Sequence, residues 1–234
     1  MTASLSIVVV TFNAQADVLA CLASVHASPP AREWDLIVVD NASSDGTPDA
    51  VAKAWPRVDV VRLPSNVGFA AANNIGIRRT RGEFVLLLNS DTLVGAGQLD
   101  ALCGALAATP GAAAAGPALL DGNGVQELSY GPMISPVGEI RQQLRQWARD
   151  SGPAWLCRRV VAAMQRRRFV DWVSGACLLV RRTAAEQVGL LDERYFMYCE
   201  DVDFCASLRA AGHRILYAPE VEVTHLRGRS RATA

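Results

Sequence analysis

Several short polar clusters in this sequence carry side chains that can hold a cation, bind a nucleotide or accept a proton. They are Asp40 with Asn41, the run Asn89–Asp91, Glu200 with Asp201, and His225. Carboxylate oxygens are the ligands that Mg²⁺ and Mn²⁺ prefer, and a partly buried carboxylate can act as a general base. The sequence therefore predicts metal-assisted or acid–base chemistry, provided that the fold brings these clusters together.

The segment LLLNSDT changes abruptly from apolar side chains to oxygen-bearing ones that end in Asp91 and Thr92. In open α/β sheets, ligands bind at the carboxyl ends of the strands, which is where this change lies. In one interpretation Asp91 binds a hard cation, since such cations often take only one or two carboxylates. In the other, Asp91 or Thr92 caps an ordinary strand-end turn. The local sequence supports both.

Asp40 and Asn41 also follow an apolar run, at the carboxyl end of a predicted strand. A carboxylate there can accept a hydrogen bond from a base N–H, and an amide can bind ribose or base, which favours a ligand-binding role. For Ser44 and Asp45 we predict helix capping, with Gly46 easing the turn.

A glycine-containing loop, PSNVGF, leads into a helix of small residues that begins near Gly68. Amides at the start of that helix can bind a diphosphate. An ordinary cap by Asn66 explains the loop equally well. The sequence contains neither G-x-x-x-x-G-K-[ST] nor G-x-G-x-x-G, which argues against P-loop and dinucleotide-binding folds.

The paired acids Glu200 and Asp201 are predicted to begin a helix that ends near Gly212. Negative charge at a helix N-terminus is favourable in itself. The apolar neighbours at Tyr195–Tyr198 are equally what a general base requires, because partial burial raises the pKa of a carboxyl. His225 fits a metal or diphosphate ligand, and also a surface histidine that follows a strand.

Strands and helices alternate along the chain, which predicts βαβ units and a parallel sheet. The predicted strands are Leu5–Val10, Leu36–Val39, Val58–Leu63 and Glu83–Leu88, and the predicted helices are Ala14–His26, Pro48–Trp55, Gly68–Arg79 and Gly97–Ala108. AAAAGPALLDGNGVQ then predicts a strand, a glycine-rich turn and a returning strand. Further on, the pattern predicts a strand over Phe169–Val180, broken at Ser174-Gly175, and a helix near Thr183–Val188.

Composition limits the class of protein. The chain has 234 residues, half of them hydrophobic, which is enough for one domain or a domain with an appendage. Basic and acidic side chains number 23 each, so the overall charge does not indicate nucleic acid as a partner. Six cysteines without a C-x-x-C pair favour a reduced, intracellular compartment. The apolar run near the N-terminus is too short to span a bilayer and is interpreted as the first strand.

Residues 135–168 are rich in arginine and lack the alternating pattern. Eight arginines (Arg141, Arg145, Arg149, Arg158, Arg159, Arg166, Arg167 and Arg168) accompany only two acids, Glu139 and Asp150. One predicted helical face carries Ile140, Leu144, Trp147 and Ala148, and a second carries Trp155, Leu156, Val160 and Met164. We predict a helical insertion that either lies on an anionic membrane surface or packs on the sheet with a solvated arginine face.

Seven motifs, taken together and in order, resemble those of the family 2 inverting glycosyltransferases. They are VVVTFN, VVDNASSDGT, NVGFAAANN, LLLNSDT, VSGACLLVRR, EDVDF and HLRGRS. The rhamnosyltransferase-like subgroup, which builds cell-envelope polysaccharides, looks nearest. The resemblance covers residues 4–120 and 169–230. Each motif alone is weak, but their combination and order are specific.

The resemblance implies an α/β fold: a single A-type glycosyltransferase domain over 1–234, Rossmann-like, with a mostly parallel central sheet flanked by helices. Within it, 1–120 would form the nucleotide-sugar-binding half, 135–168 the basic helical insertion, and 169–234 the acceptor and catalytic half.

The resemblance also implies roles for individual residues. Asn89 stands in the first acidic position of the family's D-x-D motif, which leaves Asp91 as the main carboxylate for Mg²⁺ or Mn²⁺, assisted by His225. Asp201 would be the general base, with Glu200 beside it, and Asp40 would recognise the nucleotide base. The other residues expected at the donor are Thr11, Asn13, Asn41, Asn66, Gly68, Asn73, Asn89 and Ser90; those expected at the acceptor are Trp172, Ser174 and Gly175. Arg227 and Arg229 would neutralise the diphosphate.

The predicted activity is the transfer of a sugar, with inversion, from a nucleoside diphosphate sugar to a lipid-linked or polysaccharide hydroxyl, with dTDP-rhamnose as the specific candidate donor. It needs one carboxylate to take the acceptor proton and no covalent nucleophile. We expect dependence on a divalent cation and a cytoplasmic location, at the inner face of the plasma membrane. The alternatives are a nucleotidyltransferase and a non-catalytic nucleotide-sugar-binding scaffold. A nucleotidyltransferase usually carries a basic glycine-rich signature near its first strand, and the segment VVVTFNAQADV does not contain one.

Overall fold

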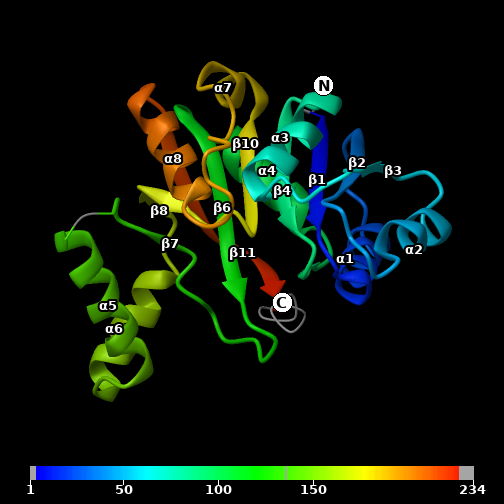
Figure 1. Ribbon diagram of the computed structural model, residues 1–234. Helices are drawn as coiled ribbons and strands as arrows, with labels where there is room; N and C mark the ends of the chain where they lie inside the picture. Colours follow the sequence, from blue (N-terminus) through cyan, green and yellow to red (C-terminus); the bar gives the residue numbers. More distant parts are fainter. Residues whose placement is uncertain (1–3, 135, 227–234) are drawn as a thin grey trace.

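One large sheet organises the residues that this computed structural model describes, 4–134 and 136–226. Within those ranges nine strands pair in the order β3-β2-β1-β4-β10-β6-β11-β5, with β8 on β11, while β7 and β9 form a separate pair. Figure 1 labels most of these strands. The strands are β1 (Leu5–Thr11), β2 (Trp34–Asp40), β3 (Asp59–Arg62), β4 (Phe84–Asn89), β5 (Thr92–Val94), β6 (Ala112–Leu120), β7 (Tyr130–Gly131), β8 (Arg168–Val170), β9 (Trp172–Val173), β10 (Cys177–Arg181) and β11 (Arg214–His225). The helices are α1 (Gln15–Ala27), α2 (Thr47–Ala54), α3 (Phe69–Arg79), α4 (Gln98–Ala107), α5 (Pro136–Asp150), α6 (Ala154–Met164), α7 (Arg182–Gln187) and α8 (Glu200–Ala210).

The central strands share one direction, and this sets the position of the polar clusters. β3, β2, β1, β4, β6 and β11 run the same way, while β10, β5 and β8 run opposite to their neighbours. The register pairs Thr11 with Asp40, and Val10 with Asn89. The polar residues that follow β1, β2 and β4 therefore meet at one edge of the sheet, as the alternating pattern predicts.

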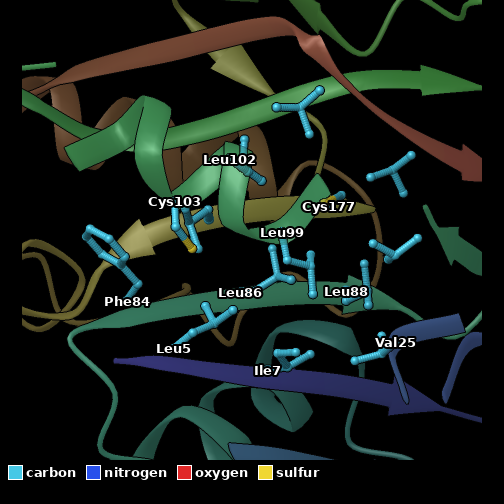
Figure 2. Close-up of a cluster of buried hydrophobic side chains, with 14 of the residues drawn as sticks. Leu5, Ile7, Val25, Phe84, Leu86, Leu88, Leu99, Leu102, Cys103 and Cys177 are labelled. Atoms are coloured by element: carbon cyan, nitrogen blue, oxygen red, sulfur yellow. The ribbon is translucent and has the colours of Figure 1, made fainter. Parts of the chain in front are cut away.

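Helices cover both faces of the sheet, and each face has its own apolar core. α1, α2 and α4 pack on one face. Figure 2 shows side chains of α1 and α4 meeting those of β1, β4 and β10. α3, α7 and α8 pack on the other face. β1 is buried along its whole length, as expected for a parallel strand covered on both sides.

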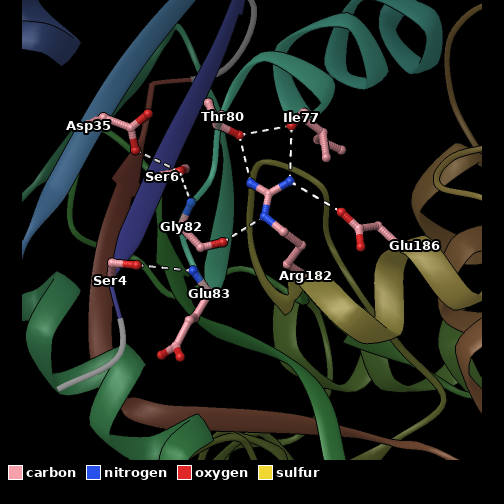
Figure 3. Close-up of polar contacts among 9 residues, drawn as sticks. All are labelled: Ser4, Ser6, Asp35, Ile77, Thr80, Gly82, Glu83, Arg182 and Glu186. Carbon is pink, nitrogen blue, oxygen red and sulfur yellow. Dashed lines mark hydrogen bonds and ion pairs between the residues drawn. The ribbon is translucent and has the colours of Figure 1, made fainter. Parts of the chain in front are cut away.

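A polar network holds the amino-terminal edge of the sheet, opposite the polar clusters (Figure 3). The Arg182 guanidinium donates to the carbonyl oxygens of Gly82 (2.7 Å) and Ile77 (3.1 Å) and to Thr80 Oγ1 (2.8 Å). Hydrogen bonds from a charged group contribute roughly 1.5–3 kcal/mol each. Arg182 therefore ties the end of α3 and the start of β4 to α7.

The predicted alternation of strands and helices through Val180 is confirmed, with shifts of a few residues at the ends. The predicted return strand after the glycine-rich turn is wrong: Gln126 forms only an isolated bridge with Leu120, because Asp121 Oδ1 binds the amides of Asn123 and Val125 and folds the chain into a turn. The sequence also gave no indication of the three-residue strand β5.

Helices α5 and α6 form a pair beside β7 and β8, away from the centre of the large sheet (Figure 1). Each of the two predicted apolar faces contains both exposed and buried side chains. Ile140, Leu144 and Trp147 are more than half exposed, whereas Ala148 is buried. On α6, Trp155 is exposed, whereas Met164 joins the core under α3 and α8. No helix among the described residues is long and apolar enough to cross a membrane.

Candidate functional site

A cavity of about 520 Å³, here called the central cavity, opens at the carboxyl edge of the sheet. This volume falls in the range of small-molecule binding sites. Its walls contain most of the predicted site residues: Thr11, Asn41, Asn66, Gly68, Asn89, Ser90, Asp91, Ser174, Gly175, Glu200, Asp201 and His225. The fold thus brings together polar clusters from both halves of the chain.

Asp91 and His225 lie side by side in the wall of the central cavity. β5 begins directly after Asp91 and pairs with β11, in a register that sets His225 opposite Thr92. His225 Nε2 lies 3.2 Å from Asp91 Oδ1, and the amide of Leu226 donates to the carbonyl oxygen of Asp91. Both side chains are largely buried. Two chain segments that are distant in sequence therefore hold one carboxylate and one imidazole side by side.

Asn89 lines the cavity next to this pair. Its Oδ1 is buried and has no hydrogen-bond partner among the described residues, while its Nδ2 lies 3.5 Å from His225 Nε2. An amide oxygen, a carboxylate and an imidazole can together bind a divalent cation such as Mn²⁺ or Mg²⁺ that takes its other ligands from phosphate and water. Among the described residues, no group of three or more His, Cys, Asp or Glu side chains is arranged to hold a metal ion. Asn89, Asp91 and His225 therefore fit a cation that takes its remaining oxygen ligands from a bound phosphate-containing substrate and from water.

Glu200 and Asp201 line the same cavity from the first turn of α8. Asp201 Oδ2 accepts a hydrogen bond from the amide of Gly175 and Oδ1 one from Val202, both at 2.8 Å. Burial raises the pKa of Asp201, and these amides oppose the rise. Burial raises the pKa of Glu200 to about 7, and Oε2 of Glu200 has no hydrogen-bond partner among the described residues. Both carboxyls therefore have the raised proton affinity that suits a general base.

The residues just before α8 form a wall that the sequence predicted only as apolar surroundings. Phe196, Met197 and Tyr198 line the cavity and are more than half exposed. Tyr198 has a positive φ of 71°, a conformation that costs energy for a non-glycine residue and is often found at functional sites. A Cβ on Gly68 would lie 2.6 Å from the carbonyl oxygen of Phe196, so only glycine permits this contact.

The loop before α3 does not present its amides as expected. The amide of Val67 donates to Asn41 Oδ1, that of Gly68 to Asn66 Oδ1, and that of Phe69 to the Phe196 carbonyl. None of these three N–H groups is free for a diphosphate, because each is used to hold the loop. Asn66 folds the loop through the Gly68 amide, but α3 begins after Gly68 without a side-chain cap, so the expected asparagine cap is also absent.

The comparison with known protein families decides the identity of the chain. The family model "Glycosyl transferase family 2" matches residues 6–167. The chain belongs to this family. A family relative from Mycobacterium tuberculosis, N-acetylglucosaminyl-diphospho-decaprenol L-rhamnosyltransferase, is 35% identical over 248 residues, which cover 98% of this chain and 78% of the relative. The protein is thus a rhamnosyltransferase-like family 2 glycosyltransferase.

Solved structures show the same fold. The mannosyltransferase PcManGT from Pyrobaculum calidifontis, in complex with GDP-Man and Mn²⁺, matches with a TM-score of 0.67 at 20% identity over 96% of this chain. GalNAc-T7 with UDP, GalNAc and Mn²⁺ matches with a TM-score of 0.69 at 15% identity, also over 96% of this chain. This chain spans 57% and 44% of those two chains. The family 2 protein therefore has the predicted A-type glycosyltransferase fold.

Four predicted site residues of this family 2 glycosyltransferase lie outside the walls of the central cavity. Asn13 Oδ1 accepts the amide of Ser44, Asn73 Nδ2 donates within α3 to Phe69, and Trp172 Nε1 donates to Pro132. Asp40 is buried and binds the Ser43 amide.

The predicted capping by Asp45 holds, since Asp45 Oδ1 accepts the amide of Thr47, whereas Ser44 binds Asn13 instead. Arg227 and Arg229 lie outside the described residues.

The raised pKa of Glu200 predicts a pH-dependent stability. The folded protein keeps the Glu200 proton between the ordinary value of 4.5 and about 7, so folding becomes less favourable as pH rises through that window. Glu200→Gln removes this ionisation. The melting temperature of the variant relative to the unmodified protein should therefore increase from pH 5 to pH 8, as measured by calorimetry.

Asp192→Asn is the control for this comparison. Arg194 lowers the pKa of Asp192, so that carboxyl is already ionised at pH 5 and its substitution should give a constant difference across the same range. A constant difference for Glu200→Gln as well would contradict the raised pKa.

Proposed function

We propose that this glycosyltransferase transfers a sugar, with inversion, from a nucleoside diphosphate donor to a hydroxyl of a lipid-linked acceptor in cell-envelope glycan synthesis. The observation that carries the proposal is that the Asp91–His225 pair and the Glu200–Asp201 pair line one cavity. The relative from Mycobacterium tuberculosis, named for L-rhamnose transfer to N-acetylglucosaminyl-diphospho-decaprenol, supports a rhamnose donor and a lipid diphosphate acceptor. dTDP-rhamnose is our candidate for this donor. We place the reaction at the cytoplasmic face of the plasma membrane.

Asp91, His225 and Asn89 would hold Mg²⁺ or Mn²⁺ together with the donor diphosphate. Both solved structures named above contain Mn²⁺, which supports a divalent cation for this fold. When bound, such a cation neutralises the negative charge of the departing diphosphate. The buried position of Asp91 and the unpaired Oδ1 of Asn89 both favour a ligand in this place.

Asp201 would act on the acceptor. Gly175 fixes one oxygen of its carboxylate at the cavity wall, and a Cβ on Gly175 would lie 3.2 Å from that of Asp201, so the two residues pack closely. Asp201 takes the proton of the acceptor hydroxyl while that oxygen forms a bond to the anomeric carbon. The bond from this carbon to the diphosphate breaks, and the diphosphate leaves with the electron pair. One displacement inverts the configuration.

Asp40 remains our candidate for recognition of the nucleotide base. Its Oδ1 is buried without a hydrogen-bond partner among the described residues, and its register partner Thr11, whose Oγ1 is equally unpaired, lines the central cavity. Ser174 and Gly175 stay proposed for the acceptor side. The nucleotidyltransferase alternative is not supported, since the family match covers the donor half.

The α5–α6 pair would contact the membrane. Ile140, Leu144, Trp147 and Trp155 are all more than half exposed, alongside the exposed arginines of both helices. Exposed tryptophan with arginine suits an anionic lipid interface, where each arginine contributes about 1 kcal/mol. Vesicle co-sedimentation should show binding to phosphatidylglycerol that falls with salt and weakens in Trp147→Ser with Trp155→Ser. Equal binding to phosphatidylcholine, or none to either, would leave the pair without a membrane role.

Asp91→Asn should abolish cation-dependent binding of dTDP or UDP while the protein stays folded, because this carboxylate contributes mainly to the ligand site. Titration calorimetry with Mn²⁺ measures the effect, and circular dichroism checks the fold. Asp59→Asn, an exposed carboxylate at the start of β3, is the control and should bind as the unmodified protein does. Unchanged affinity in Asp91→Asn would show that NSDT is an ordinary strand-end turn and not a cation site.

Asp201→Asn should keep donor affinity and lower the transfer rate by a factor on the order of 10² to 10⁴, the usual contribution of a positioned general base. Glu200→Gln should have a milder effect, since Asp201 remains. A panel of nucleoside diphosphate sugars with a lipid-linked acceptor measures both. If Glu200→Gln abolishes transfer and Asp201→Asn does not, Glu200 is the base. If neither substitution changes the rate, or no sugar is transferred, a non-catalytic scaffold is the better description.

A further inference from the structure

A second cavity, of about 220 Å³, lies between the α5–α6 pair and the strands β7 and β8. Arg145 of α5, Arg159 of α6 and Arg168 of β8 line it together with apolar side chains that include Leu156, Val160 and Met164. We call it the arginine cavity. Among the described residues no acidic side chain lines this cavity. Its three arginine charges therefore lie beside apolar side chains with no negative charge in the lining.

The three arginines have donors to spare. Arg168 stacks over the ring of Tyr130, 5.3 Å from its centroid, and its Nη2 is buried without a hydrogen-bond partner among the described residues. No ion pair between described residues involves any of the three, whereas Arg167, next to Arg168, pairs with Glu220. A buried, unpaired guanidinium nitrogen is costly, and a phosphate oxygen is the partner that arginine binds best.

The arginine cavity lies one strand pair from the central cavity. Tyr130, which lines the arginine cavity, pairs with Val173 in the β7–β9 ribbon. The next residue along, Ser174, lines the central cavity and donates its amide to the Ser129 carbonyl at 2.8 Å. A ligand can therefore have its anionic group in one cavity and a neighbouring sugar hydroxyl near the other.

We propose that the arginine cavity binds the diphosphate of the lipid-linked acceptor, with the first part of the lipid chain against Leu156, Val160 and Met164. Uncompensated positive charge above an apolar surface is complementary to a diphosphate attached to an apolar chain. The proposal rests on the proposed function, since it identifies where that acceptor is held.

Titration calorimetry with farnesyl diphosphate, in the absence of divalent cations, tests this assignment. The double variant Arg145→Gln with Arg159→Gln should bind it about tenfold more weakly or worse than the unmodified protein, because two charge-assisted contacts are lost. The matched control is Arg158→Gln with Arg166→Gln, which removes the same charge from exposed positions outside the cavity and should bind normally. Equal binding by all three proteins, or equal loss in both variants, would overturn the proposal.

Three other probes identify the ligand class. Farnesol and inorganic diphosphate should each bind much more weakly than farnesyl diphosphate, since each lacks half of the complementary chemistry. Phosphatidylglycerol vesicles should not displace farnesyl diphosphate; if they do, and only when Arg145 and Arg159 are present, the cavity holds a membrane headgroup and the acceptor assignment is wrong.

Binding of dTDP with Mn²⁺ separates this proposal from the proposed function. It should be unchanged in the Arg145/Arg159 variant, because the donor lies in the central cavity. If dTDP fails to bind any of the proteins while the farnesyl diphosphate difference persists, the proposed function fails and the arginine cavity still binds a lipid diphosphate. If dTDP binds and the difference is absent, only the arginine cavity proposal fails.

Discussion

The site depends on the in-register parallel pairing of β1 with β2 and β4. A shift of one residue in a strand would reverse every side chain and move Thr11, Asp40 or Asn89 off the shared edge. Burial alone defines this register weakly, because these strands are apolar on both faces. Polar contacts at the other edge supply the missing specificity: Ser6 Oγ donates to Asp35 at 2.6 Å and accepts the amide of Gly82 at 2.8 Å (Figure 3). The amino-terminal edge thus fixes the geometry of the carboxyl edge.

The two edges differ in how completely their polar groups are paired. At the amino-terminal edge, Arg182 and the serines satisfy the loop carbonyls and amides. At the carboxyl edge, Thr11 Oγ1, Asp40 Oδ1, Asn89 Oδ1 and Glu200 Oε2 are buried without a partner among the described residues. Such groups lower stability unless a ligand or water binds them. Their concentration around one cavity is the physical sign of a binding site, and it is independent of the family resemblance.

Local pattern could predict the strands and helices of this chain, and with the topology rule it could predict that Asp40 and Asn89 share an edge. It could not predict the Asp91–His225 contact, because that contact requires the pairing of β11 with β5, which has three residues and no distinctive pattern. Asn73 shows a second limit of local pattern: a motif suggests a ligand contact for this asparagine, but it does not predict that its side chain bonds back to Phe69 within α3. The arginine cavity was equally hidden, since the arginine-rich segment predicts charge but not which side chains converge.

The charges of the central cavity suit a donor that brings its own negative charge. With Asn89 in place of an acid, Asp91 is the carboxylate that would bind the proposed cation, and the imidazole of His225 adds no negative charge. Burial also favours the uncharged form of Glu200 up to about pH 7. A site with fewer carboxylates binds a free cation less tightly, but it repels a nucleoside diphosphate less. In the proposed function, the cation would therefore be held chiefly when the diphosphate supplies charged oxygen ligands, because the amide oxygen of Asn89 is neutral.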